Sequence, residues 1–395
     1  MLTGSRQEIL KHPLSLMVLA YLFLVAIHIS LARFNYDQPL IDGIIAARSQ
    51  YIYVAFFLYV LLLDKTESIA RLLDYLSFIA IGVLILSVVN YFFPVIFHSW
   101  RSVEWIVERG GIRRVFIPAM PLIGLATVWV MCRWVDAEDR RWKYAVMALI
   151  LVAGHFFYQS RGPLFGVLIS ILVIVVLKRR FAELGYIFLF AILAGAILTF
   201  TLPENILLTP FSSAVEDISE GSGTVKGRLV QYEDDMQEFM EHPWIGSGLV
   251  AVRASEYGGV GKDKQEMALK TRKVDLGYTH WIKMYGVAGL AWLTIVMYMI
   301  GRRSYILFRR TYGLQNTLAL FAFSQFSFTA ITGVTMAHFL VPEQIVLFCL
   351  MAAIVVLLQK NSLSESASER PPRINAAATQ RPKSSRILQP RQRNL

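Results

Sequence analysis

Apolar residues in this chain come in long runs, separated by short polar stretches. Each run is about 20 residues long, which is the length a helix needs to cross the hydrocarbon core of a bilayer. Helices are expected because every backbone polar group must be satisfied inside lipid. The pattern predicts about ten transmembrane helices, at residues 13–32, 44–63, 71–93, 115–133, 142–158, 162–178, 184–202, 279–301, 313–333 and 341–358.

Composition agrees with this all-α polytopic membrane fold. The chain is 55% hydrophobic and only 17% charged, whereas a soluble protein has about 25% charged residues. The first run lacks a small-residue cleavage site and is long enough to span, so it is not a signal peptide. Cys132 and Cys349 are too few for a disulfide framework or a zinc site.

The distribution of basic residues predicts the orientation. With a cytoplasmic N-terminus, the short inner loops hold 13 Lys and Arg residues and the short outer segments hold six. Cytoplasmic loops carry the excess of positive charge, so both termini are expected in the cytoplasm. The net charge of +11 follows this topology, and we expect no nucleic-acid partner.

Two segments differ from the membrane pattern. Residues 1–361 are expected to form one transmembrane domain, in which residues 203–278 make a single large external loop. Residues 362–395 are rich in Ser, Pro, Ala and Arg, and this composition predicts a disordered basic cytoplasmic tail. The tail is interpreted mainly as a solvated topogenic segment, although its arginines could also contact anionic membrane lipids.

The external loop contains one predicted amphipathic helix, "VKGRLVQYEDDMQEFMEHPWIGSG". Pro243 ends this helix and the following glycines turn the chain. Such a helix could lie on the membrane interface or cover a cavity. The apolar face consists of Val225, Leu229, Tyr232, Met236 and Met240, and the polar face of Arg228, Gln231, Asp235, Glu238 and His242.

Several arginines lie on the outer side, against the charge bias. Arg113 and Arg114 stand in "WRSVEWIVERGGIRRVFIP", and Arg161 stands in "HFFYQSRGPLFG" between two apolar runs. A charge near lipid costs roughly 3 kcal/mol unless it reaches water or a partner. These arginines either snorkel or pair with nearby glutamates, or they form a patch for a phosphate-bearing substrate, whose oxygens a guanidinium binds in pairs.

His280, in "LGYTHWIKMYGVAGLAWL", lies at the outer end of a predicted span. A single histidine is most often structural. It is also the side chain whose unperturbed pKa suits proton transfer near neutral pH. No cluster of Asp, Glu and His with ligand spacing is evident at a membrane face, so no metal site is predicted.

Four segments, in this order, resemble the O-antigen ligase and surface polysaccharide polymerase family: "RGGIRRVFIPAMPLIGLA", "SRGPLFGVLIS", "GRLVQYEDDMQEFMEHPWIGSGL" and "THWIKMYGVAGLAWL". The resemblance covers roughly residues 100–300. The chain departs from the family pattern in two places. A usual Pro-Asn pair is missing near Pro118 and Pro121, and Trp281 replaces an Asn after the histidine.

The resemblance implies a GT-C-type glycosyltransferase of the bacterial cytoplasmic (inner) membrane. Such an enzyme transfers an undecaprenyl-diphosphate-linked glycan to an acceptor hydroxyl on the outer face, without a metal or another cofactor. The acceptor is a lipid A-core sugar for a ligase or another lipid-linked glycan for a polymerase. The resemblance implies that Arg161 and Arg228 hold the diphosphate and that His280 is the base. We expect Arg113 and Arg114 to assist, and the anomeric carbon to be inverted.

Two other functions fit part of the pattern. A transporter or flippase for lipid-linked sugars would use a similar basic cavity, but the chain has no repeated halves with broken helices. A peptidoglycan-type glycan polymerase would rely on an external acidic residue, for which Asp217, Asp234 and Asp235 are candidates. The sequence does not separate ligase from polymerase.

Overall fold

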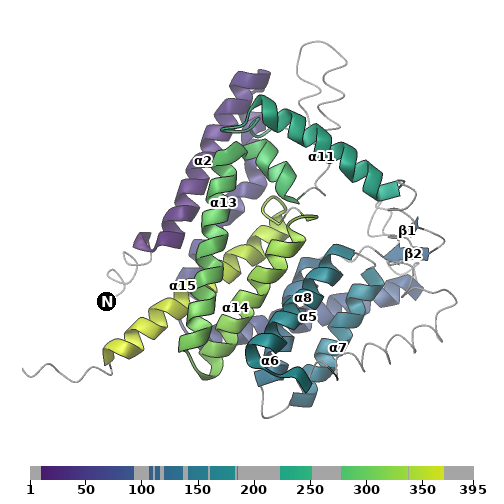
Figure 1. Ribbon diagram of the computed structural model, residues 1–395, viewed down its shortest axis with the longest axis vertical. Coiled ribbons are helices and arrows are strands. Elements are labelled where there is room, and N and C mark those ends of the chain that lie inside the picture. Colours follow the sequence, from purple (N-terminus) through teal and green to yellow (C-terminus); the bar gives the residue numbers. More distant parts are fainter. Residues whose placement is uncertain are drawn as a thin grey trace, which may run out of the picture.

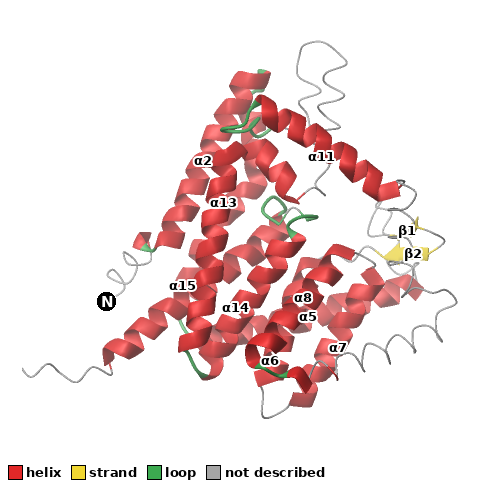
Figure 2. Ribbon diagram, viewed as in Figure 1, coloured by secondary structure: helices red, strands yellow, loops and turns green. Residues whose placement is uncertain are grey.

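The computed structural model describes residues 10–92, 106–109, 112–115, 120–136, 141–158, 161–182, 185, 223–250, 277–336 and 338–368. Helices dominate these residues (Figure 2). They are α2 (Pro13–Tyr36), α3 (Leu40–Ala46), the 3-10 helix η1 (Ala47–Val54), α4 (Ala55–Leu62), α5 (Thr66–Phe92), α6 (Met120–Asp136), α7 (Arg141–Tyr158), α8 (Arg161–Lys178), α11 (Gly223–Glu241), α13 (Gly277–Arg310), α14 (Gly313–Thr332) and α15 (Pro342–Ser368).

Five helical segments in the described part of the chain are long and apolar enough to cross a membrane. They are Pro13–Tyr36, Leu40–Leu62, Thr66–Val89, Gly277–Arg310 and Pro342–Ser362, and two shorter apolar helices lie in α7 and α8. These helices support a multi-pass membrane protein. The predicted number of ten spans is not confirmed, and the predicted span 184–202 lies outside the described residues except for residue 185.

The predicted span 115–133 begins later in the structure than the sequence indicates. Residues 112–115, which include the expected start of the span at 115, form a strand, and α6 begins only at Met120. Strands β1 (Ile106–Arg109) and β2 (Ile112–Val115) pair as an antiparallel hairpin. This short extended segment is the exception to the predicted all-helical fold among the described residues. It contains Ile106, Val107, Ile112 and Val115, and β-branched residues of this kind favour strands.

The helices form a bundle in which α14 has a central position. This helix packs against α13 on one side and α8 on the other, and it also contacts α5, α6 and α15. Helix α6 in turn contacts α5, α7 and α8. Helix α2 packs against α13, and the segment η1–α4 packs against α15. Helix α11 crosses one end of this bundle (Figure 1). This end is called the α11 end below.

The first and last described helices meet at the other end. His12, which caps α2, lies 3.3 Å from the side-chain oxygen of Gln359 in α15, and Arg303 of α13 contacts both residues. The start of α2 and the C-terminal part of α15 therefore lie on one side of the bundle. Helix α15 continues to Ser368, beyond the predicted start of the tail at 362.

Large apolar side chains cover the outside of the bundle. Phe23 of α2 is 70% exposed and Leu62 of α4 is 75% exposed. In water such a surface would be an aggregation hazard. In a bilayer these side chains face lipid tails, which are as apolar as they are.

Helix α13 is broken near its start. Gly286 has φ 61° and ψ −160°, so residues 277–285 and 287–310 form two helical pieces. In an unbroken helix the N–H groups of residues 287 and 288 would bond to the carbonyls of residues 283 and 284. The break leaves these four groups without helical partners, and in a membrane each unsatisfied group costs several kcal/mol.

A turn after α11 supplies the missing partners. The N–H groups of Ser247 and Gly248 donate to the carbonyls of Lys283 and Met284, at 3.0 and 3.2 Å. The carbonyls of Pro243 and Trp244 accept from the N–H groups of Val287 and Ala288, at 2.8 and 3.1 Å. The segment "HPWIGSG", residues 242–248, is therefore inserted into the helix as a spacer. We call it the 242–248 turn.

Two glycines make this insertion possible. A Cβ atom on Gly286 would lie 2.5 Å from the backbone nitrogen of Gly246, and a Cβ atom on Gly246 would lie 2.4 Å from the carbonyl oxygen of Met284. Both residues have positive φ. Only glycine accepts this combination of conformation and close backbone contact.

The first prediction concerns Gly286→Ala. This variant should lose roughly 3 kcal/mol of stability or more, because φ and ψ lie in a region that is essentially restricted to glycine and because the new methyl meets backbone. The control is Gly82→Ala in α5, where a Cβ atom meets nothing within 4 Å. Thermal unfolding of the purified proteins in detergent measures both. Equal melting temperatures for the two variants would show that the break does not require glycine.

Candidate active site

A cluster of charged side chains is buried where α11 packs on the first piece of α13. Asp235 of α11 is 4% exposed, and Lys283 and His280 of α13 are 4% and 9% exposed. His280 and Lys283 lie three residues apart and therefore share one face of their helix. Charged side chains are rarely buried unless they are paired, so their partners determine what the cluster can do.

Lys283 lies between two carboxylates. Its Nζ atom is 3.1 Å from Asp235 Oδ1 and 2.8 Å from Glu238 Oε2. Glu238 also accepts a hydrogen bond of 3.4 Å from the hydroxyl of Tyr36, at the end of α2. The ammonium group therefore joins α11 to α13 through two ion pairs.

The environment of Asp235 keeps this residue ionised. Burial favours the neutral acid, but the nearby His280 and the positive charge of Lys283 outweigh burial, and the pKa of Asp235 lies below its usual value of 3.8. A depressed pKa means that the charged form stabilises the folded state. This contribution is present above pH 3.8 and is lost as the pH falls through the lower pKa of the folded protein.

The ring of His280 faces the second oxygen of Asp235. The distance from Nδ1 to Oδ2 is 3.7 Å, which is longer than a hydrogen bond. Neither atom has a hydrogen-bond partner among the described residues, although both are buried. A small movement of the ring or of α11 would close the gap. The carboxylate of Asp235 therefore faces Nδ1 of the His280 ring, at a distance slightly too long for a hydrogen bond.

The opposite face of the first piece of α13 is aromatic. Trp281 is fully buried and stacks on Tyr21, with ring centroids 5.4 Å apart, and on Trp292, at 5.7 Å. Tyr285 contacts Trp281 at 4.5 Å, and its hydroxyl accepts a hydrogen bond of 2.9 Å from Tyr21. Trp281, which replaces the Asn of the family pattern, therefore points into the core. Its packing against Tyr21 and Trp292 fixes the rotation of this helical piece, so that His280 faces α11.

The amphipathic helix α11 is oriented with its polar face inward. Asp235 and Glu238 pack on α13, whereas Leu229, Met236 and Met240 are 56%, 45% and 69% exposed. This arrangement would be unfavourable in water. It suits a helix at the surface of a membrane, whose apolar side can contact lipid.

One short turn after α14 brings three of the predicted segments together. The hydroxyl of Tyr232 in α11 donates to the carbonyl of Val334, at 3.1 Å, and the N–H of Tyr278 in α13 donates to the carbonyl of Gly333, at 2.9 Å. A Cβ atom on Gly162, the second residue of α8, would lie 2.6 Å from the hydroxyl of Thr335. Residues 333–335, called the 333–335 turn, thus contact α8, α11 and α13.

The predicted site residues lie close in sequence to these contacts. Arg161 is the first residue of α8, directly before Gly162. Arg228 lies in α11, one helical turn before Tyr232. His280 follows Tyr278 by two residues. The structure thus brings the backbones of these segments to one turn, while the side chains of Arg161 and Arg228 lie outside what the structure describes.

Arg113 and Arg114 lie in strand β2, where they pair with Glu108 and Val107 of β1. The strand contacts α7, which ends at Tyr158, shortly before Arg161. The side chains of both arginines lie outside the described residues, so their part in the site stays a prediction.

Sequence reasoning missed the partners of His280. The sequence places Asp235 and Glu238 on the polar face of the external helix and offers Asp235 as the acidic residue of a different polymerase, but it indicates no contact of either with His280, and it assigns no role to Lys283. The spacing contains a signal for them. Asp235 and Glu238 are three residues apart, as are His280 and Lys283, so each pair lies on one helical face. What the sequence does not contain is the packing of one face on the other.

Comparison with known proteins supports the resemblance drawn from the motifs. Residues 145–280 match the model of a protein family described as O-antigen ligase. The match includes Arg161 and Arg228 and ends at His280, and it leaves Arg113 and Arg114 outside. No curated protein matches the chain. The family resemblance is thus confirmed over residues 145–280, and it supports a membrane enzyme with glycosyltransferase-like activity in polysaccharide biosynthesis.

The second prediction concerns Lys283→Met. This change leaves Asp235 and Glu238 facing each other without a counter-charge, and removing one partner of a buried ion pair destabilises by roughly 3 kcal/mol. The matched control is Lys65→Met, at an exposed position before α5, which should stay within about 0.5 kcal/mol of the wild type. Thermal unfolding in detergent compares them. A Lys283→Met protein as stable as the control would mean that the cluster does not hold α11 on α13.

Proposed function

We propose that this chain, with its O-antigen ligase family domain at residues 145–280, is a glycosyltransferase of the bacterial inner membrane. Its donor is a glycan linked through diphosphate to undecaprenol, and its acceptor is a hydroxyl group of a glycan or of lipid A-core sugar. The reaction takes place on the outer face of the membrane, which is the α11 end of the bundle. It inverts the anomeric carbon and needs no metal. Both termini lie in the cytoplasm.

One observation carries this proposal. His280 stands with the buried carboxylate of Asp235 behind it, and the segments that carry Arg161, Arg228 and His280 all meet the 333–335 turn. Transfer from a diphosphate is favoured by a base that accepts the proton of the acceptor hydroxyl. It is also favoured by arginines that stabilise the negative charge of the leaving diphosphate.

The reaction follows from these groups. Nε2 of a neutral His280 accepts the proton of the acceptor hydroxyl as the hydroxyl oxygen attacks the anomeric carbon. The bond between that carbon and the diphosphate oxygen breaks, and its electron pair goes to the oxygen. Attack opposite the leaving group inverts the carbon. Arg161 and Arg228 bind the diphosphate, whose negative charge increases as the bond breaks, so they stabilise the transition state more than the bound donor.

Asp235 acts through His280. The imidazolium that forms during proton transfer carries its second proton on Nδ1, and Asp235 Oδ2 is the acceptor that faces this atom. The positive charge of Lys283 keeps Asp235 ionised for this role. Asp235 is therefore a positioning residue, and His280 is the catalytic residue.

The membrane location fits the exposed apolar row on α11. Leu229, Met236 and Met240 lie on the outside of this helix, and an undecaprenyl chain remains in the bilayer while its diphosphate reaches the surface. We propose that α11 lies along that surface and carries Arg228 to the level of the diphosphate.

The third prediction tests the reaction itself. The purified protein receives an undecaprenyl-diphosphate-linked glycan and a candidate acceptor, and release of undecaprenyl diphosphate is followed. His280→Ala should lower turnover by at least about 100-fold, because general-base catalysis contributes this much. Arg161→Lys keeps the charge but loses the bidentate fork, and it should also slow release. A metal chelator should leave the rate unchanged.

Other outcomes identify other functions. If the wild type binds the lipid-linked glycan and moves it across vesicles without releasing undecaprenyl diphosphate, the protein is a transporter. If His280→Ala turns over as fast as the wild type, the base is another group. If a chelator abolishes activity and a divalent metal restores it, the metal-independent mechanism is wrong.

The fourth prediction separates Asp235 from its neighbour. Asp235→Asn should lower kcat by roughly 10- to 100-fold with little change in the KM of the acceptor, by analogy with carboxylates that orient metal-binding histidines, whose loss has effects of this size. Asp235→Glu should recover part of the loss. Asp234→Asn, one residue away in α11, is the matched control and should behave as wild type. A fall in kcat of the same size in both Asn variants would point to damage to α11 and not to orientation of His280.

A further inference from the structure

The end of the bundle opposite α11 carries a groove of about 500 Å³. It lies between the end of α8 and the turn that joins α13 to α14. Helix α8 has 18 residues and is therefore about 27 Å long, so its two ends are separated by nearly the thickness of the hydrocarbon core. The groove is lined by Val176, Leu177, Arg179, Phe308, Arg309, Thr311, Tyr312, Gly313 and Asn316.

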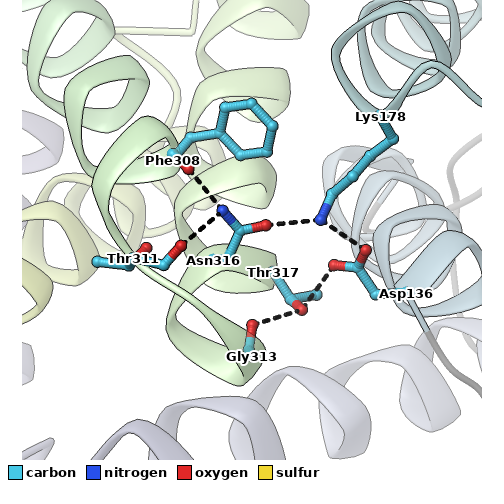
Figure 3. Close-up of polar contacts among 7 residues, drawn as sticks. All are labelled: Asp136, Lys178, Phe308, Thr311, Gly313, Asn316 and Thr317. Atoms are coloured by element: carbon cyan, nitrogen blue, oxygen red, sulfur yellow. Dashed lines mark hydrogen bonds and ion pairs between the residues drawn. The ribbon is translucent and has the colours of Figure 1, made fainter.

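The groove contains two arginines without partners. Arg179 and Arg309 are both exposed, and no hydrogen bond or ion pair joins either side chain to another described residue. The neighbouring Lys178 is different. Its Nζ atom lies 2.6 Å from Asp136 Oδ1 and donates to Asn316 at 2.6 Å (Figure 3). The positive charge of Lys178 is therefore neutralised inside the bundle, while two positive charges remain free in the groove.

The helix ends do not explain these two arginines. Arginines in a last helical turn can bond to the free carbonyls there, but other groups already bond to these carbonyls. The N–H groups of Arg179 and Arg180 donate to Val176 and Val175. The side-chain amide of Asn316 donates to the carbonyls of Phe308, at 2.5 Å, and Thr311, at 3.1 Å (Figure 3). The guanidinium groups are free to bind a ligand.

The same network makes the wall of the groove rigid. Asp136 accepts a hydrogen bond of 2.7 Å from Thr317 as well as the ion pair with Lys178 (Figure 3). Helices α6, α8 and α14 are thus tied together at this end. Because these helices are fixed, the groove keeps its shape. A ligand then loses less binding free energy to ordering of the groove.

The edge of the groove is apolar and open to the outside. Val176 is 47% exposed and Tyr312 is 89% exposed. A ligand that fits must therefore carry negative charge at the level of the arginines and apolar surface beside it. Phosphate suits two guanidinium groups, since each binds its oxygens in pairs, and the apolar part follows the surface of α8 into the bilayer.

We propose that this groove binds the phosphate headgroup of an anionic phospholipid, with Arg179 and Arg309 as its ligands. The site is separate from the proposed transfer reaction, which takes place at the other end of the bundle. The headgroup lies against the two arginines, and the acyl chains lie along Val176. Free phosphate offers the same charge without the apolar part, and binds more weakly.

The fifth prediction measures this binding in the full-length protein. The purified protein is exchanged into detergent with phosphatidylglycerol or phosphatidylcholine, and the retained lipid is counted by native mass spectrometry. Phosphatidylglycerol should be retained in preference, and Arg179→Gln with Arg309→Gln should weaken this retention by roughly 30-fold, at about fivefold for each arginine near a charged headgroup. Arg71→Gln with Arg302→Gln removes the same charge from two exposed arginines outside the groove and should have no such effect.

A third variant covers the case in which the double arginine variant does not fold. Val176→Trp fills the groove and keeps both charges, and it should also release the lipid. Equal losses in the two double variants would mean that general charge attracts the lipid, and the groove would have no specific role. Full displacement of phosphatidylglycerol by millimolar inorganic phosphate would make the ligand a free anion. Unchanged retention in Val176→Trp would overturn the proposed location.

Discussion

The break in α13 at Gly286 is the constraint on which the α11 end of the molecule depends. A membrane helix is stable because each carbonyl has a donor four residues later, and a break removes this arrangement where water does not replace it. The 242–248 turn restores it with four backbone hydrogen bonds to the two sides of the break. Non-helical backbone inside a membrane is tolerated only where it is buried in protein or lines a water-filled cavity, and here it is buried in protein. These hydrogen bonds explain why the 242–248 turn, although distant in sequence from Gly286, has a fixed position against α13.

The position of the turn determines the position of the charges. Because the 242–248 turn follows α11 directly, fixing the turn in α13 holds the last turns of α11 against the first turns of α13. Asp235 and Glu238 then face Lys283 and His280. The aromatic contacts of Trp281 and Tyr285 prevent the first piece of α13 from rotating away. Backbone hydrogen bonds, aromatic packing and the ion pairs therefore all support the same arrangement of His280.

The sequence predicts the membrane class and the segments of the site better than it predicts their contacts. Apolar runs locate most of the described helices, since length and hydropathy are local properties. The motif ending in Gly246 and Gly248 indicates a turn, but its insertion into α13 depends on a partner 40 residues away. The paired strands Ile106–Arg109 and Ile112–Val115 are not predicted, because Val115 continues into an apolar run whose pattern indicates a helix. Lys283 was missed because its partners lie on another helix.

The two ends of the bundle differ in how completely their polar groups are satisfied. At the end of Lys178, the ammonium, the carboxylate of Asp136 and the amide of Asn316 all have partners. At the α11 end, His280 Nδ1 and Asp235 Oδ2 face each other across 3.7 Å, and neither has a hydrogen bond to another described residue. Buried polar atoms without partners cost about 1–3 kcal/mol each, so a contact that gives both atoms a partner would stabilise the folded state. A proton that arrives on His280 allows this contact to become a charge-assisted hydrogen bond. The unsatisfied pair therefore leaves room for one further contact at the α11 end, while the satisfied network at the opposite end holds the bundle in place.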